Sequence, residues 1–396
     1  MIYDLIVVGG GPAGSAAAQQ AAGAGLHTLL LEKDPFPRHK PCGGGLSEPA
    51  IREFDSPLPD GIISGDCRGV RVIFGNLVQE SRFPFRVATL TDRAAFDTFL
   101  LDLAVKAGTQ VRYERVAEVK PEPEWVMIRT DRGTYRGRAV VGADGAGSIA
   151  RSVVRRRQRR DILLFSLSAE IPIASVVRNS PAAELGAQEM VEIHIGRVAR
   201  GYCWIFPKGD RLSAGIAGLG ESRRTIQAKW ESFCLENGLT PTSAPRAHII
   251  PSYHPDDPLV ADRIVLAGDA AGAADPFLGE GIYYARLSGK LAAERISSLL
   301  ASGSSLKAED LRPYQAACRK AYADELLYAR SVFNLLFRLP VWLQRRVFTN
   351  ADVLGRYMEI PAGRSTYRRY WRWLLPSMPV ALIRSHKAST RKTLDG

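Results

Sequence analysis

The segment Asp4-Leu5-Ile6-Val7-Val8-Gly9-Gly10-Gly11-Pro12-Ala13-Gly14 decides the fold of this sequence. Its apolar run Leu5–Val8 is typical of a strand that is buried on both faces. Pro12–Ala24 is rich in Ala and Gln and has no β-branched residue, which favours a helix packed closely on a sheet. Leu29–Glu32 is the next apolar run, so the order strand, helix, strand predicts a parallel sheet with a right-handed crossover.

The turn between the first strand and the helix predicts a dinucleotide site. It reads G-x-G-x-x-G, and its glycines let the backbone approach a pyrophosphate that the helix N-terminus attracts. Glu32 ends the second strand, where a carboxylate can accept hydrogen bonds from both ribose hydroxyls of an adenosine. Its charge would repel a 2′-phosphate, so the site suits FAD or NAD. The residues that we expect at the cofactor here are Gly9, Gly11, Pro12, Ala13, Gly14, Glu32 and Lys33.

Two later segments combine a predicted strand with a glycine turn. Gly142–Arg151 reads Gly-Ala-Asp-Gly-Ala-Gly-Ser-Ile-Ala-Arg, and Leu266–Ala271 reads Leu-Ala-Gly-Asp-Ala-Ala. They resemble the second and third nucleotide motifs of the flavoprotein class that includes para-hydroxybenzoate hydroxylase. The sequence departs from that class at Gly272, where His is common. An ordinary Asp-Gly turn is the alternative for the first segment, but three motifs in this order favour FAD over NAD.

The resemblance to this class implies further cofactor contacts. Asp144 lies at the FAD, Asp269 accepts hydrogen bonds from the ribityl chain, and Arg93 lies near the pyrophosphate, unless it is a surface arginine. The long helix predicted from about Gly281 to Ala301 directs its N-terminus at the flavin N1–C2=O edge, which favours the anionic reduced flavin by roughly 0.5–2 kcal/mol. The residues of this last segment that we expect at the cofactor are Gly268, Asp269, Pro276, Gly279, Gly281 and Ile282.

Two other motifs narrow the class. The loop Lys40-Pro41-Cys42-Gly43-Gly44 resembles the Pro-Cys-Gly-Gly loop of the geranylgeranyl reductase family. Tyr202–Lys208 resembles the Tyr-x-Trp-x-Phe-Pro-Lys strand of that family, and the segment from Gly363 to Pro376 is also similar to it. The resemblance covers essentially the whole chain. It implies reduction of isolated C=C bonds in a prenyl chain by hydride from flavin N5 together with a proton.

An isolated alkene has no carbonyl to polarise, so positioning in a dry site is the main contribution an enzyme can make. Tyr202, Trp204 and Phe206 alternate, so on a strand they share one face. That face either walls the substrate or belongs to the core. Burial of a C20 chain is worth at most ~10–16 kcal/mol at ~0.8 kcal/mol per carbon. A diphosphate head would meet Lys208, Arg82 or an arginine of the C-terminal region, and the sequence does not choose among them.

Cys42 is the one cysteine with a predicted chemical role. By resemblance, it and the following residues Gly43 and Gly44 lie near the flavin ring. In one interpretation Cys42 has a chemical role, in which it donates the proton or tunes the local electrostatic field. In the other it is simply a small residue that fits beneath the isoalloxazine. The five cysteines are odd in number and contain no CxxC pair, so we expect neither a disulfide framework nor a metal site. The other four are expected to be small buried hydrophobes.

The predicted fold is α/β, with a Rossmann-like FAD-binding domain, an inserted antiparallel β-sheet substrate domain and a helical C-terminal region. We expect the FAD-binding domain to comprise residues 1–65, 92–162 and 255–301. The expected substrate domain comprises residues 66–91 and 163–254, and the basic helical region comprises residues 302–396. Hydrophobic content of 46% and charged content of 24% suit such a globular protein.

The net charge of +12 is concentrated at one end. From Leu326 onward there are 13 Lys and Arg against three Asp and Glu. Apolar stretches at 332–343 and 367–375 are edged by arginines, so these helices either contact a membrane surface or cap a substrate cavity. Zinc-finger, homeodomain and RNP patterns are missing, which disfavours nucleic acid. No apolar run reaches ~18 residues and the first strand starts at Ile2, so we expect a cytoplasmic protein, either free or peripheral on the membrane.

Two other functions stay open. A flavin monooxygenase or halogenase would use the same FAD motifs, and Tyr202–Pro207 resembles the Trp-x-Trp-x-Ile-Pro strand of flavin halogenases, although Pro41–Gly44 is not their loop. A non-enzymatic carrier of prenyl lipid or flavin is the second rival. The electron donor is NADPH, bound transiently because no second Rossmann motif occurs, or a ferredoxin, whose acidic surface would suit the basic charge.

Overall fold

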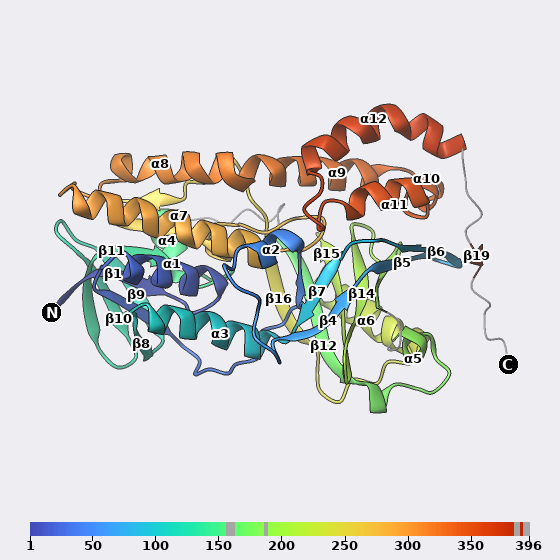
Figure 1. Cartoon of the computed structure of the whole chain (residues 1–396), viewed down its shortest axis with the longest axis horizontal. Coiled ribbons are helices and arrows are strands. Elements are labelled where there is room, and N and C mark those ends of the chain that lie inside the picture. Colours follow the sequence, from blue (N-terminus) through green and yellow to red (C-terminus); the bar gives the residue numbers. More distant parts are fainter. Residues whose placement is uncertain (156–162, 186–188, 384–388, 391–396) are drawn as a thin grey trace. The chain divides into compact units, whose positions relative to one another are not determined.

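The computed structural model describes residues 1–155, 163–185, 189–383 and 389–390. The chain forms two compact units, and each is assembled from three separate stretches of sequence (Figure 1). The first unit comprises Met1–His39, Arg93–Ile162 and Ile250–Leu327. The second comprises Lys40–Asp92, Leu163–Ile249 and Tyr328–Gly396.

The first unit is built on a parallel sheet, as the sequence predicts. Strand β1 (Ile2–Val8) lies between β2 (Thr28–Glu32) and β11 (Thr134–Gly142) and is parallel to both. Two more parallel strands extend the sheet, β8 beyond β2 and β18 beyond β11. Antiparallel strands complete the sheet, because β17 pairs with β18, and β10 pairs with both β11 and β9. The remaining strands of this sheet are β8 (Gln110–Tyr113), β9 (Val116–Pro121), β10 (Val126–Thr130), β17 (Val260–Ala261) and β18 (Ile264–Leu266).

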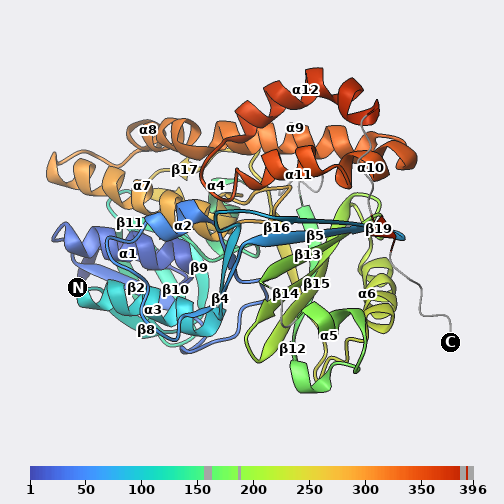
Figure 2. The ribbon, with the colours of Figure 1, turned by 45° about the vertical axis from the view of Figure 1, so that its right-hand side comes forward.

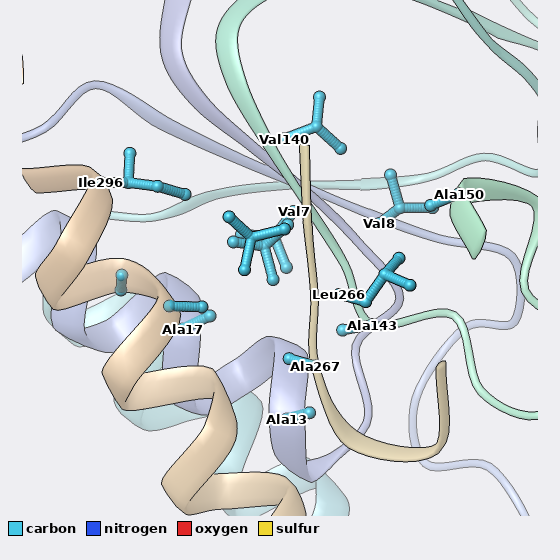
Figure 3. Close-up of a cluster of buried hydrophobic side chains, with 14 of the residues drawn as sticks. Val7, Val8, Ala13, Ala17, Val140, Ala143, Ala150, Leu266, Ala267 and Ile296 are labelled. Carbon is cyan, nitrogen blue, oxygen red and sulfur yellow. The ribbon is translucent and has the colours of Figure 1, made fainter. Parts of the chain in front are cut away.

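Helix α1 (Pro12–Gly23) joins β1 to β2 and packs against α7 (Ile282–Ala301). The two helices approach closely because small residues line both: a Cβ on Gly289 would lie 2.1 Å from the carbonyl oxygen of Ala13. Figure 3 shows side chains of three sheet strands and of both helices gathered in one apolar cluster. The other described helices of this unit are α3 (Arg93–Lys106), α4 (Ile149–Val154), the 3-10 turn η3 (Gly268–Ala270), α8 (Ala308–Cys318) and the π-helical turn η4 (Arg319–Ala323).

The second unit contains another eight-stranded sheet and a smaller one. Its central strands β12 (Leu163–Pro172), β15 (Arg211–Leu219), β14 (Gly201–Lys208) and β13 (Met190–Ile195) are antiparallel neighbours. The next pair, β13 with β5 (Gly69–Phe74), is parallel, so the sheet is mixed at this point, although the sequence predicts an antiparallel one. The sheet also includes β16 (Arg246–Pro251), β6 (Leu77–Arg82) and β19 (Ser389–Thr390); a separate small sheet holds β3 (Gly45–Leu46), β4 (Ile63–Cys67) and β7 (Ala88–Thr91).

The two faces of the larger sheet are covered differently. Cys203 and Ile205 of β14 join an apolar core with Trp230 and Phe233 of helix α6 (Arg223–Asn237). Alternate residues of the same strand, which include Tyr202, point to the opposite face. Other helices of this unit are α2 (Glu48–Arg52), the 3-10 turn η2 (Ile173–Ser175) and α5 (Pro181–Leu185).

The C-terminal helices cover that opposite face at one end. Phe74 of β5 is paired through Ile195 with Tyr202, so these residues share a face, and the Phe74 ring lies 6.5 Å from Phe348. Figure 2 shows these helices on the side of the sheet away from α6. Among the described residues, every helix is too short or too polar to span a membrane. The helices are α9 (Asp324–Arg338), α10 (Val341–Phe348), α11 (Ala351–Met358) and α12 (Tyr367–Ile383).

Some local expectations change in the structure. Helix α6 lies inside the strand-rich segment and was not predicted. The compact units also place residues 40–65 in the second unit and residues 302–327 in the first. The expected domains differ from these units because each was defined by the ligand that it would bind. The assignment of segments to FAD or to substrate stays a prediction.

Candidate active site

The first glycine turn forms a backbone cradle at the carboxyl end of β1. Gly9 has a left-handed φ of +99°, and a Cβ there would lie 2.4 Å from the carbonyl oxygen of Ala143. A Cβ on Gly14 would lie 1.8 Å from the carbonyl oxygen of Gly9. Helix α1 starts directly after the turn and has no side-chain cap, so its first N–H groups are available to an anion.

Glu32 stands beside this turn at the end of β2. Its Oε2 accepts a 2.7 Å hydrogen bond from the Gly10 N–H, and its side chain is almost fully buried. Arg38 lies 3.7 Å from the Glu32 carboxylate and 3.3 Å from Asp97. The Nε of Arg38 is buried and has no hydrogen-bond partner among the residues that the structure describes. Arg38 therefore adds a cation beside the cradle that sequence reasoning missed, because its only signal is a place in a proline-rich loop.

The second glycine segment is organised by Asp144. Its carboxylate accepts hydrogen bonds from the Ser148 hydroxyl and from the backbone N–H of Ile149, at 2.6 Å, so it caps α4. Burial raises the pKa of Asp144, and these hydrogen bonds act in the opposite direction. The carboxylate thus shapes the loop. Arg93, the predicted pyrophosphate ligand, makes two 2.9 Å hydrogen bonds to Asp97 one helical turn later and is buried.

The third segment places Asp269 near the start of α7. Gly268 has a φ of +60° and donates its N–H to the Ser288 hydroxyl at 2.9 Å. Asp269 Oδ1 would lie 3.9 Å from a Cβ on Gly281, the residue that precedes α7. Helix α7 also has no side-chain cap. Asp269 therefore lies near the N-terminus of α7, and its contact with the ribityl chain stays a prediction.

Asp275 orders the loop that leads into α7. It is fully buried, and its Oδ1 accepts hydrogen bonds from the N–H groups of Phe277, at 2.7 Å, and Leu278, at 3.1 Å. These contacts fix the stretch that contains Pro276 and Gly279, whose φ is +70°. The sequence reasoning did not single out Asp275, although Asp before Pro is a turn signal.

These features of the first unit fit the adenosine and diphosphate part of FAD. The glycine cradle would be filled by side chains at Gly9 and Gly14, the buried Arg38 Nε has no hydrogen-bond partner among the described residues, and the carboxylate of Glu32 lies beside the turn at the end of β2. Lys33 is exposed, whereas Ala13 and Ile282 are buried at the starts of the two uncapped helices. In the described ranges, no group of His, Cys, Asp and Glu is arranged to hold a metal ion.

The Cys42 loop lies on the aromatic face of the second unit's large sheet. A Cβ on Gly43 would lie 2.9 Å from the Phe206 ring and 3.3 Å from Trp204 Nε1. The carbonyl oxygen of Cys42 accepts a 3.3 Å hydrogen bond from the Ser213 hydroxyl. The Gly44 N–H donates to the Cys42 sulfur at 3.3 Å. The loop and the aromatic strand, predicted separately from the sequence, are in direct contact.

The predicted aromatic residues form one row. Tyr202 and Trp204 have ring centroids 6.1 Å apart, and Trp204 and Phe206 have centroids 6.4 Å apart. The opposing strand β15 provides small partners, and a Cβ on Gly215 would lie 2.1 Å from the Trp204 ring. The indole N–H of Trp204 is buried and has no hydrogen-bond partner within the described part of the chain.

Lys208 lies against Gly44 of the Cys42 loop. Its Nζ donates to Glu170 Oε1 at 2.9 Å, and only 2% of its side chain is exposed. Gly44, with φ +72°, is so close that a Cβ there would lie 2.6 Å from Nζ and 2.3 Å from the carbonyl oxygen of Thr91. The ion pair thus supports the loop. Arg82, a second predicted head-group residue, is exposed at the end of β6.

The cysteines differ in their surroundings. Cys42 is partly exposed, whereas the other four are buried and carry no disulfide. Burial raises the pKa of Cys67, Cys203 and Cys234 to about 12 and that of Cys318 to about 11. These four thiols are therefore unreactive hydrophobic groups, as expected, and Cys42 is the accessible one.

The parallel sheet and its three glycine turns define the class: the protein is an FAD-dependent oxidoreductase. A family model described as FAD dependent oxidoreductase matches residues 4–153. Geranylgeranyl diphosphate reductase of Rhodobacter capsulatus is 33% identical over 93% of this chain and 92% of that protein. The chain therefore belongs to the geranylgeranyl reductase family, which confirms the resemblance seen in its motifs.

Other relatives extend the range of named substrates. Digeranylgeranylglycerophospholipid reductase of Methanoculleus marisnigri is 30% identical, with 82% of this chain and 84% of that protein covered. Among solved structures, a geranylgeranyl bacteriochlorophyll reductase-like protein of Thermoplasma acidophilum matches with a TM-score of 0.78 and 23% identity over 94% of this chain and 98% of that one. A flavin-dependent brominase matches with a TM-score of 0.69 and 18% identity over 96% and 100% of the two chains. These structures show a shared fold.

Proposed function

We propose that this protein is an FAD-dependent reductase that saturates isolated C=C bonds of a prenyl chain of the geranylgeranyl type. The observation that carries the proposal is the contact of the Cys42 loop with Trp204 and Phe206, because both motifs distinguish this family from other flavoproteins. The names of the relatives support a prenyl diphosphate or a prenyl glycerophospholipid as substrate.

In the proposed site, Gly9, Gly11, Gly14 and Glu32 hold the adenosine and diphosphate of FAD, and Asp269 holds the ribityl chain. Bound and reduced FAD supplies the hydride. The open N-terminus of α7 favours negative charge on the cofactor by roughly 0.5–2 kcal/mol. Arg38 contributes a further positive charge beside the glycine turn.

The second unit supplies the surface for the substrate. Tyr202, Trp204 and Phe206 present an apolar row on which an alkene can be oriented without water. Cys42 gives a proton to the alkene carbon that does not receive the hydride, and water protonates its thiolate afterwards. The Gly44 N–H donates to the Cys42 sulfur and orients it, and the Lys208–Glu170 pair lies directly against Gly44.

The electron donor and the location are parts of this proposal. NADPH or a ferredoxin reduces the cofactor, and the basic charge of the chain suits an acidic donor protein. Trp342 is exposed on α10 with Arg346 5.8 Å from its ring, an arrangement suited to a membrane interface. Flotation of the purified protein with liposomes, with and without anionic lipid, tests this surface, and a lack of salt-sensitive binding would exclude it.

The reductase activity is tested with chemically reduced protein and geranylgeranyl diphosphate. Mass spectrometry should show products heavier by two hydrogen atoms for each double bond that is reduced. Oxygen uptake is measured in parallel, because a monooxygenase or halogenase consumes O2 in step with product and a reductase does not. Oxygen-coupled product would replace the proposal by the first rival. Failure with every prenyl compound would favour a carrier.

A further inference from the structure

A row of polar side chains on α9 meets Arg200. Arg330, Asn334 and Arg338 are four residues apart, so they lie along one face of the helix. Arg200, in the turn before β14, donates to Asn334 Oδ1 at 2.6 Å. Its guanidinium carbon also lies 5.5 Å from the centre of the Phe333 ring. Arg200 is thus fixed beside the middle of a row that has an arginine at each end.

This arrangement concentrates positive charge. The pKa of Arg200 is lowered by burial and, further, by the positive charges of Arg338 and Arg330. Arg200 Nε is buried and has no hydrogen-bond partner among the described residues. A bound oxyanion would offset the repulsion between these arginines and would accept a hydrogen bond from the Arg200 Nε–H. The planar guanidinium group matches the oxygens of a phosphate particularly well.

The charge cluster lies at one end of the aromatic row. Arg200 precedes Tyr202 by two residues, while the Cys42 loop contacts the strand at Trp204 and Phe206. At about 3.3 Å per residue, Arg200 is roughly 13 Å from Trp204 and roughly 20 Å from Phe206 along the strand. A few isoprene units in extended form span such a distance.

We propose that Arg200, Arg330 and Arg338, ordered by Asn334, bind the phosphate or diphosphate head group of a prenyl substrate whose reacting double bond lies near Trp204. The identity of the prenyl substrate rests on the proposed function, whereas the oxyanion site does not. Of the three options that the sequence left open, the assignment selects arginines of the C-terminal region over Lys208, which is buried against Glu170. In this arrangement the head group binds at the start of β14, and the apolar chain packs along the aromatic residues of the same strand.

Calorimetry with inorganic diphosphate tests the site without catalysis. Arg200→Gln and Arg338→Gln are compared with wild type and with Arg312→Gln, an exposed arginine on α8 that serves as the matched control. Arg338 is exposed at the end of α9, so its replacement leaves the core intact. Each cluster variant should bind diphosphate about tenfold more weakly, and the control should bind as wild type does. Equal binding by all four proteins, or no binding by wild type, overturns the proposal.

Kinetics then identify the source of the oxyanion. Wild type and Arg338→Gln are given geranylgeranyl diphosphate, a digeranylgeranyl glycerophospholipid and the neutral alcohol geranylgeraniol. The variant should show a KM about tenfold higher for one or both phosphate-bearing substrates and an unchanged KM for the alcohol. The substrate whose KM rises identifies the head group that the site binds. An equal change for the alcohol would refute the site. If no compound is reduced, the proposed function fails, but calorimetry still decides whether the oxyanion site exists.

Discussion

Trp204 and Gly215 face each other on β14 and β15, and the indole ring occupies the space in which a side chain of residue 215 would lie. The glycine therefore sets the position of the ring that we propose as the substrate wall. Because the ring also borders Gly43, a change at residue 215 is transmitted to the Cys42 loop. The row of aromatic residues depends on the small residues across from it.

Gly215→Ala should displace the Trp204 ring and lower prenyl reduction by on the order of tenfold to 100-fold, because small errors in alignment are costly. FAD content, read from the absorbance of the purified protein, should not change. Gly133→Ala is the control, since a Cβ there meets only the Tyr135 hydroxyl at 4.0 Å. Full activity of Gly215→Ala would show that the ring does not orient the substrate.

Cys42→Ala should keep FAD and slow alkene reduction, because the proton would have to come from water. General acid groups typically increase reaction rates by about 100-fold to 10,000-fold. The single-turnover rate of the chemically reduced variant should therefore decrease by a factor in that range. Cys67→Ala, which removes a buried thiol, is the matched control and should keep the wild-type rate. Unchanged turnover in Cys42→Ala would remove the proton-donor role.

Iodoacetamide at pH 8 should modify Cys42 first in the native protein. The other four thiols are buried and their pKa values are raised to about 11 or 12, so almost none of them is ionised at this pH. Peptide mass spectrometry after brief labelling gives the order of reaction. Modification of Cys203 or Cys318 before Cys42 would contradict the structure. Protection of Cys42 by added FAD would support its place at the cofactor.

Glu32→Gln should weaken FAD binding by about tenfold to 100-fold, the loss expected when hydrogen bonds to a charged group are removed. The Gly10 N–H would also lose its charged acceptor, which would loosen the glycine turn. Titration of the apoprotein with FAD, followed by flavin fluorescence, measures the change. Glu124→Gln, an exposed residue of the same unit, should bind FAD like wild type. Equal affinities of Glu32→Gln and wild type would place the adenosine elsewhere.

Lys208→Met should destabilise the second unit by on the order of 1–3 kcal/mol, because Glu170 would lose its partner while still largely buried. The double variant Lys208→Met with Glu170→Leu should recover part of this loss. Denaturant unfolding followed by tryptophan fluorescence compares the proteins. Wild-type stability of Lys208→Met would mean that the ion pair does not hold Gly44.

The sequence predicted those parts of the site that depend on local patterns. The strand, turn and helix around Gly9 are determined by short-range geometry, and so is the alternation of Tyr202, Trp204 and Phe206. Lys208 was one of three options for the head group, and its ion pair with Glu170 could not be predicted because the two residues are 38 positions apart in the sequence. The Arg200 cluster also joins segments distant in sequence, and helix α6 was hidden by a strand-rich neighbourhood.

Gly289 illustrates how far the cofactor site reaches along the chain. It sits in the middle of α7 and resembles any other helical glycine, yet it allows α7 to touch the backbone of Ala13. A variant at this position would look like a harmless helix-strengthening change in a mutational scan. The purified variant would lack the yellow colour of bound flavin, although the substituted residue lies far along the chain from the glycine motif that it disrupts.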